Sequence, residues 1–241
     1  MSDPIIQALK ESVYAANMAL VQAGLVVLTW GNASGIDRER GIVAIKPSGV
    51  AYASLTPDAI VLVSLETGKP LDSETLRPSS DTPTHLCLYQ NFPELGGIAH
   101  THSRYATSWA QAARAIPCYG TTHADTFHGD VPLCRPLTPE EIDSGYEWNT
   151  GQVIVEHFGA NTLNPAHVPG VLLPFHAPFA WGISPAEAVE HAIIVEEVAA
   201  LAWHTELLNP DAKTAPHAVT EKHFTRKHGK NAYYGQPGTV G

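Results

Sequence analysis

Residues 96–103 carry a His-x-His pair, His100 and His102, at the end of a short apolar run. The run predicts a buried strand, on which alternate side chains point to the same face. Two imidazoles side by side on a rigid strand are two of the three ligands that a catalytic zinc site needs. A lone His-x-His pair is more often two ordinary polar residues, so the metal hypothesis depends on further ligands.

The third ligand is expected from the segment after the predicted strand 170–173. His176 lies there between two prolines that restrict its backbone. His85 and His123 are competing candidates. Asp81 is a candidate fourth ligand or metal neighbour, although an Asp at a helix start often only favours the helix dipole.

Three predicted turns could hold an anion such as a phosphate. Each has small residues whose backbone N–H groups can approach an anion, and Ser, Asn or Lys side chains add donors. None matches the Gly-x-x-x-x-Gly-Lys-Ser/Thr loop of nucleoside triphosphate sites, and singly each is more often a plain turn. The turns are Gly31-Asn32, Lys46-Pro47-Ser48-Gly49 and Ser79-Ser80.

Composition narrows the class of protein. The 241 residues carry 24 acidic and 14 basic side chains, a net charge of −10, which argues against nucleic-acid binding. The 3 cysteines form no Cys-x-x-Cys pair and fit a reducing cytoplasm, where we expect the protein. The N-terminus does not read as a signal peptide, and no stretch is apolar for long enough to span a membrane.

The elements that must position these residues alternate between hairpins and helices. This mixture predicts one α/β domain over residues 1–241, with a mixed or antiparallel sheet covered by helices on both faces. Residues 222–241 could be disordered by composition. Helices are expected at 4–23, 82–91, 103–115, 138–158 with a break near 144–145, and 184–208. Strands are expected at 25–29, 41–46, 59–65, 69–71, within 96–103 where the strand ends in His-x-His, and at 170–173. Turns are expected at 30–35 and 178–182, and loop and short strand at 116–136.

Motifs spread over nearly the whole chain resemble the class II aldolase family. Within that family they are most similar to the members that invert C4 of a pentulose 5-phosphate. One departure is Ala177, where such members carry glycine after the histidine. The motifs are Leu28-Thr29-Trp30-Gly31-Asn32, Ile45-Lys46-Pro47-Ser48-Gly49-Val50, Pro78-Ser79-Ser80-Asp81-Thr82-Pro83-Thr84-His85, His100-Thr101-His102-Ser103, Gly120-Thr121-Thr122-His123-Ala124-Asp125, Pro178-Phe179-Ala180-Trp181-Gly182, Arg226-Lys227-His228-Gly229 and Tyr233-Tyr234-Gly235.

The resemblance implies a three-layer α/β/α sandwich around a central, largely antiparallel sheet. It implies a cyclic homotetramer with active sites between subunits, where the tail 222–241 reaches a neighbouring subunit. A pentulose 5-phosphate would be the substrate, and zinc or another divalent cation the cofactor. The implied residues are His100, His102, His176 and Asp81 at the metal, Gly31, Asn32, Lys46, Ser48, Gly49, Ser79 and Ser80 around the phosphate, and Asp125 and Tyr234 as catalytic acid and base.

The implied reaction interconverts L-ribulose 5-phosphate and D-xylulose 5-phosphate. The C4–H bond is not next to the carbonyl, so breaking and remaking the C3–C4 bond is the easier route, and a metal can stabilise the resulting enediolate. The nearest alternative is a class II sugar-phosphate aldolase, which generally carries Glu where this chain has Asp81. A non-catalytic scaffolding relative would lack the three histidines, and a three-histidine hydratase would not explain the phosphate turns.

Overall fold

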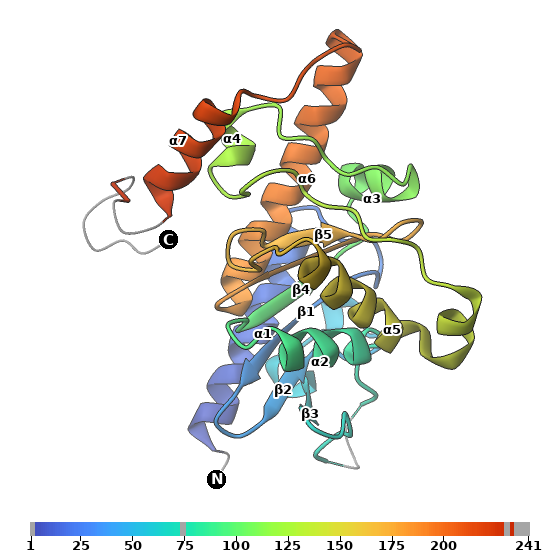
Figure 1. Ribbon diagram of the computed structural model, residues 1–241. Coiled ribbons are helices and arrows are strands. Elements are labelled where there is room, and N and C mark those ends of the chain that lie inside the picture. The colour runs from blue at the N-terminus through green and yellow to red at the C-terminus, as the bar shows by residue number, and fades with distance from the viewer. Residues whose placement is uncertain (1–2, 73–75, 229–231, 234–241) are drawn as a thin grey trace.

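The computed structural model describes residues 3–72, 76–228 and 232–233. Its centre is a six-stranded sheet in the order β3-β2-β1-β4-β6-β5 (Figure 1). All neighbouring strands are antiparallel, which confirms the expected sheet. The strands are β1 (Asn32–Asp37), β2 (Ile42–Ile45), β3 (Val61–Ser64), β4 (Gly97–His100), β5 (Gly170–Leu172) and β6 (Pro178–Gly182).

Helices cover both faces of the sheet, so the molecule has the expected three layers (Figure 1). Helices α1 and α6 pack on one face, and α2 and α5 pack on each other over the opposite face. None of the helices in the described ranges is long and apolar enough to cross a membrane. The helices are α1 (Pro4–Gln22), α2 (Thr82–Asn91), α3 (Arg104–Gln111), α4 (Thr121–Ala124), α5 (Pro139–Ala160), α6 (Pro185–Leu208) and α7 (His217–Lys227), with 3₁₀ turns η1 (Tyr52–Ser54) and η2 (Pro57–Ala59).

The prediction of a strand at 25–29 followed by a turn is wrong. Strand β1 begins instead at Asn32, after a segment in which Leu28 has a positive φ of 55°. The β1 sequence Asn-Ala-Ser-Gly-Ile-Asp has no hydrophobic run because its neighbours leave little room: a Cβ on Gly35 would lie 2.7 Å from Pro185. Small residues and buried polar groups therefore occupy a central strand.

Two further elements were predicted incorrectly at the C-terminal side. The expected aromatic turn at 178–182 is strand β6, whose proline takes the first position, where a missing N–H is tolerated. Residues 222–227, which composition suggested could be disordered, belong to α7. Most of the remaining tail lies outside the described residues.

Smaller differences concern element ends. The helix expected to reach residue 115 ends at Gln111, near Ala113 with its positive φ of 51°. The expected strand 69–71 makes only a bridge, between Pro70 and Val63. The segment 116–136, expected as loop and short strand, contains the single helical turn α4.

The predicted helix signals in α5 are confirmed. Thr138 and Glu141 form a capping box with both hydrogen bonds present. Gly145 has non-helical angles, φ 157° and ψ 75°, at the expected break. The kink lets one continuous segment change direction over the sheet.

Asn17 joins α1 to the sheet beside the β1 strand end. Strand β2 pairs with β1 only from Ser34 onward, so the outer N–H and C=O of Ala33 have no strand partner. The Asn17 carboxamide takes that place: its Oδ1 accepts from Ala33 N and its Nδ2 donates to Ala33 O, both at 2.9 Å. Asn17 is fully buried, at 0% exposure, so no water can replace these bonds.

Replacing Asn17 by alanine should lower the free energy of unfolding by about 2–4 kcal/mol, because two buried backbone groups lose their partners. Denaturant unfolding monitored by circular dichroism measures the change. The matched control Asn161→Ala removes an exposed amide at the end of α5 and should cost under about 1 kcal/mol. Equal losses in both variants would contradict a bridging role for Asn17.

Candidate active site

The structure brings His100, His102 and His176 together. One ligand nitrogen from each can be chosen so that all lie within 4.8 Å of one another. The ring centroids are 4.9 Å apart for His100–His102, 4.9 Å for His100–His176 and 5.1 Å for His102–His176. The competing candidates His85 and His123 are also buried, but neither belongs to this group of ligand atoms.

The sheet fixes the orientation of His100. It ends β4 and pairs with Phe179 of β6, on which its ring stacks at 4.2 Å and 19°. The His100 Nδ1–H donates to the carbonyl of Pro178 at 3.0 Å. This bond leaves the Nε2 lone pair facing His102, whose Nε2 is 3.2 Å away, as in metal-ligating histidines whose second nitrogen is held by a carbonyl.

A tight turn presents His176. Leu173 N donates to Ala177 O and His176 N donates to Leu173 O, so the chain reverses between β5 and β6. Tyr146 of α5 places its hydroxyl 3.4 Å from His176 Nδ1. Sequence reasoning missed Tyr146, because a tyrosine on the surface of an amphipathic helix carries no signal of a site.

Burial keeps the imidazoles of His102 and His176 neutral. It lowers the pKa of His102 to about 4 and that of His176 to about 3, and the nearby His100 adds to both shifts. A neutral imidazole has a free lone pair at neutral pH, which is the form that binds a metal ion. The three histidines have the geometry that a divalent cation requires, and two of them, His102 and His176, have the required protonation.

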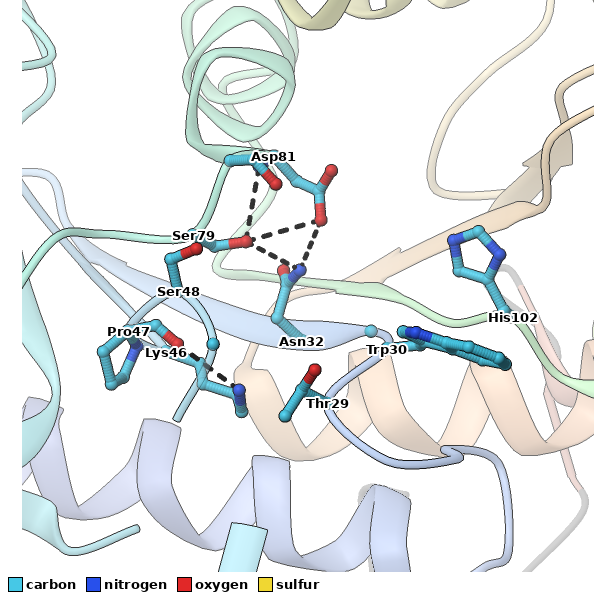
Figure 2. A pocket seen from close by; sticks show the side chains of 12 residues that line it. Thr29, Trp30, Asn32, Lys46, Pro47, Ser48, Ser79, Asp81 and His102 are labelled. Atoms are coloured by element: carbon cyan, nitrogen blue, oxygen red, sulfur yellow. Dashed lines mark hydrogen bonds between the residues drawn. The ribbon is translucent and has the colours of Figure 1, made fainter. Parts of the chain in front are cut away.

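Asp81 adds a carboxylate next to the histidines. Burial raises its pKa, but His100, His85 and a hydrogen bond from Asn32 outweigh this and hold the pKa below its usual value. Asn32 Nδ2 donates to Asp81 Oδ2 at 2.6 Å (Figure 2). The Asp81 side chain makes no capping bond to α2, so the simple helix-start explanation does not account for it.

The three predicted anion turns meet in one cleft of about 470 Å³ (Figure 2). Ser79 N donates to Lys46 O and Ser48 N to Arg77 O, so two of the turns are tied together by backbone bonds. The third turn needs Gly31, where φ is 95° and a Cβ would lie 2.8 Å from His100 O. The lining residues are Thr29, Trp30, Gly31, Asn32, Lys46, Pro47, Ser48, Gly49, Ser79, Ser80, Asp81 and His102.

Lys46 is the cation among the residues that line the cleft. Its ammonium group lies 4.7 Å from the centre of the Tyr52 ring and 3.3 Å from Pro47 O, and burial lowers its pKa. Tyr52 in turn donates its hydroxyl proton to Gly31 O at 2.9 Å. The lysine is thus held by groups that link two of the anion turns.

Asp125 lies away from this cleft, between α4 and α7. Arg226 binds its carboxylate through Nε at 3.0 Å and Nη2 at 2.7 Å, and His223 Nδ1 is 3.0 Å from Oδ1. Burial raises the pKa of Asp125, but the bonds from Arg226 and His223 outweigh it and lower the pKa. The structure therefore does not bring Asp125 to the metal-ligand group, and Tyr234 lies outside the described residues.

Known proteins share this arrangement of elements. In solved structures, an L-fuculose 1-phosphate aldolase has a TM-score of 0.75 at 24% identity, over 91% of this chain and 95% of that one. YgbL from Klebsiella pneumoniae, described as a putative aldolase/epimerase/decarboxylase, has a TM-score of 0.68 at 22% identity, over 90% and 98%. These similarities establish the fold.

Sequence similarity is stronger and covers nearly the whole chain. Proteins from Salmonella paratyphi A and Salmonella typhi, each named L-ribulose-5-phosphate 4-epimerase UlaF, are 53% identical over 231 residues, 96% of this chain and 100% of theirs. The family model described as class II aldolase and adducin N-terminal domain matches residues 11–203. The chain therefore belongs to the class II aldolase and adducin N-terminal domain family.

Proposed function

We propose that this protein is an L-ribulose-5-phosphate 4-epimerase, which interconverts L-ribulose 5-phosphate and D-xylulose 5-phosphate. The observation that carries the proposal is that the cleft joins His102 and Asp81 to all three anion turns. A phosphate-bearing substrate can thus reach the metal-ligand group. The names of the relatives at 53% identity support the same reaction.

The proposed cofactor is zinc, held by His100, His102 and His176 with Asp81 beside it. Three clustered imidazoles fit this ion, because catalytic zinc commonly has three protein ligands and one open position, and the lowered pKa values of His102 and His176 keep those two rings in the ligating form. Bound there, the cation would supply Lewis-acid stabilisation of negative charge on substrate oxygens.

The anion turns hold the substrate phosphate in this proposal. Backbone N–H groups at Gly31 and Gly49 and the hydroxyls of Ser48, Ser79 and Ser80 donate to it, and Asn32 completes the polar wall. Lys46 supplies positive charge that partly offsets the net acidity of the protein. Held by its phosphate, the two-carbon aldehyde fragment formed by C3–C4 cleavage can turn over without escaping.

Inversion at C4 needs one group on each side of the carbon to take or give the hydroxyl proton. We assign these roles to Asp125 and Tyr234. Because Asp125 does not line the cleft of its own chain, it would act in the cleft of a neighbouring subunit. We further propose that the working enzyme is a homotetramer in the cytoplasm, in which the tail 222–241 reaches the next subunit.

Purified protein should convert L-ribulose 5-phosphate to D-xylulose 5-phosphate, and removal of divalent metal with a chelator should abolish the activity until zinc is restored. A coupled assay for each pentulose phosphate measures both directions. Net release of glycolaldehyde phosphate without the epimer would identify an aldolase instead. Unchanged activity after verified metal removal would contradict a metal-dependent reaction.

Zinc affinity should depend weakly on pH above about 5, because protons compete only near the lowered pKa values of His102 and His176. Between pH 7.5 and 5.5 we expect the zinc affinity to fall by at most about tenfold. If His102 and His176 instead had the ordinary pKa of about 6.5, these two residues alone would lower the affinity by about 100-fold. Competition titration with a zinc chelator measures this. The control His204→Ala, an exposed histidine, should not alter the profile.

Mixed tetramers test the shared site. Asp125→Asn and Lys46→Met should each be inactive alone, because one removes the proton acceptor and the other the cation of the cleft. Co-expressed, they should regain about a quarter of wild-type activity, since one subunit can supply Lys46 and its neighbour Asp125. Activity no higher than that of the separate variants would place Asp125 and Lys46 in the same subunit's site. The control is the variant that carries both Asp125→Asn and Lys46→Met in every subunit.

A further inference from the structure

A buried polar chain lies behind the candidate metal site, where β1 meets α2. Tyr89 Oη and Ser34 Oγ are 2.9 Å apart, and Ser34 Oγ lies 2.7 Å from His85 Nδ1. All three residues are fully buried, at 0% exposure, and none lines the cleft. The His85 and Phe179 rings form a T-shaped pair with centroids 6.0 Å apart, and His100 stacks on the same Phe179.

The direction of the hydrogen bonds follows from which atoms have partners. Ser34 Oγ is the atom of this buried chain that can accept the Tyr89 phenol proton, so Tyr89 donates to Ser34. The Ser34 hydroxyl then donates to His85 Nδ1. Burial lowers the pKa of His85 to about 3, so the ring is neutral, and because Nδ1 accepts a hydrogen bond the ring proton is on Nε2. The reverse direction would leave both the Tyr89 O–H and a bare His85 Nε2 unpaired, which is less favourable.

Two buried polar atoms, His85 Nε2 and Asn32 Oδ1, lack a partner among the described residues. Both residues interact with Asp81, Asn32 through a hydrogen bond and His85 electrostatically. Asn32 and Ser34 lie two residues apart and share one face of β1. Both unpaired atoms belong to neighbours of Asp81. The Asn32 side chain donates to the Asp81 carboxylate. His85 follows Asp81 by one helical turn, and its backbone N–H donates to the Asp81 carbonyl. A donor, an acceptor and a carboxylate together suit one buried water, which typically makes about three hydrogen bonds.

We propose that His85 is a positioning residue for Asp81, whose Nε2–H donates to a buried water that Asn32 Oδ1 and the Asp81 carboxylate also bind. The Tyr89–Ser34 pair fixes the tautomer of His85, and the water fixes the orientation of the carboxylate beside the metal-ligand histidines. The catalytic consequence rests on the proposed epimerase function, whereas the tautomer of His85 does not. Mutation of a group that orients a metal-site residue in this way commonly lowers activity or metal affinity by about 10–100-fold.

Two variants separate the nitrogens of His85. The amide nitrogen of glutamine can take the place of Nε2, whereas that of asparagine can take the place of Nδ1. His85→Gln should therefore retain kcat within about threefold, while His85→Asn should lower kcat by about 10–100-fold with KM changed by less than about threefold. Bound zinc and melting temperature are measured on both. Loss of kcat in His85→Gln, or its retention in His85→Asn, would overturn the positioning role.

The tautomer can be read without catalysis. In a long-range ¹H–¹⁵N correlation spectrum of the metal-free protein, His85, assigned by its absence in His85→Gln, should be the Nε2–H tautomer between about pH 6 and 8. Tyr89→Phe should weaken this preference, because Ser34 loses its donor. An Nδ1–H tautomer in the wild-type protein would overturn the inference. A wild-type protein without epimerase activity would refute the proposed function instead, since the spectrum is independent of turnover.

Discussion

The antiparallel register of three strands places Asn32, His100 and Phe179 in one row across the sheet. Asn32 at one end of the row binds Asp81, and Phe179 at the other end supports the His100 ring. Side chains alternate along a strand, so a slip of one residue in β4 would turn His100 to the opposite face. The candidate metal site and the anion turns therefore depend on this register.

The surroundings of the row hold the register in place. The Asn17 carboxamide completes the hydrogen bonds of Ala33 next to Asn32. At the start of β4, a Cβ on Gly97 would lie 2.4 Å from the backbone of Pro185, so α6 and the strand contact each other directly. The other face of β1 contributes polar side chains to α2, through Asn32 to Asp81 and Ser34 to His85. Close packing on one face and directional bonds on the other leave little freedom for a shift.

The sequence predicted a sheet covered by helices on both faces, the α5 kink and its capping box because these depend on local periodicity, on caps and on glycine. Local pattern left the sheet as mixed or antiparallel, and the family resemblance implied the antiparallel type. The sequence also predicted that His100, His102 and His176 lie together. The His-x-His spacing puts His100 and His102 on one face of the strand, whichever residue ends the strand. It failed at β1, because its small and polar residues are selected by tertiary packing that leaves no hydrophobic pattern. Tyr146 was missed for a similar reason: only the folded chain brings α5 to His176.

The cleft and Asp125 occupy different parts of the chain. One part supplies three clustered histidines, a carboxylate with a lowered pKa and the anion turns; the other holds a carboxylate between Arg226 and His223. The central claim is that the three histidines bind the catalytic cation. Anomalous X-ray diffraction at the zinc edge, on crystals of active protein, tests it most directly. One peak is expected about 2.0–2.1 Å from a nitrogen of each of His100, His102 and His176. A peak elsewhere, or none in active protein, would contradict it.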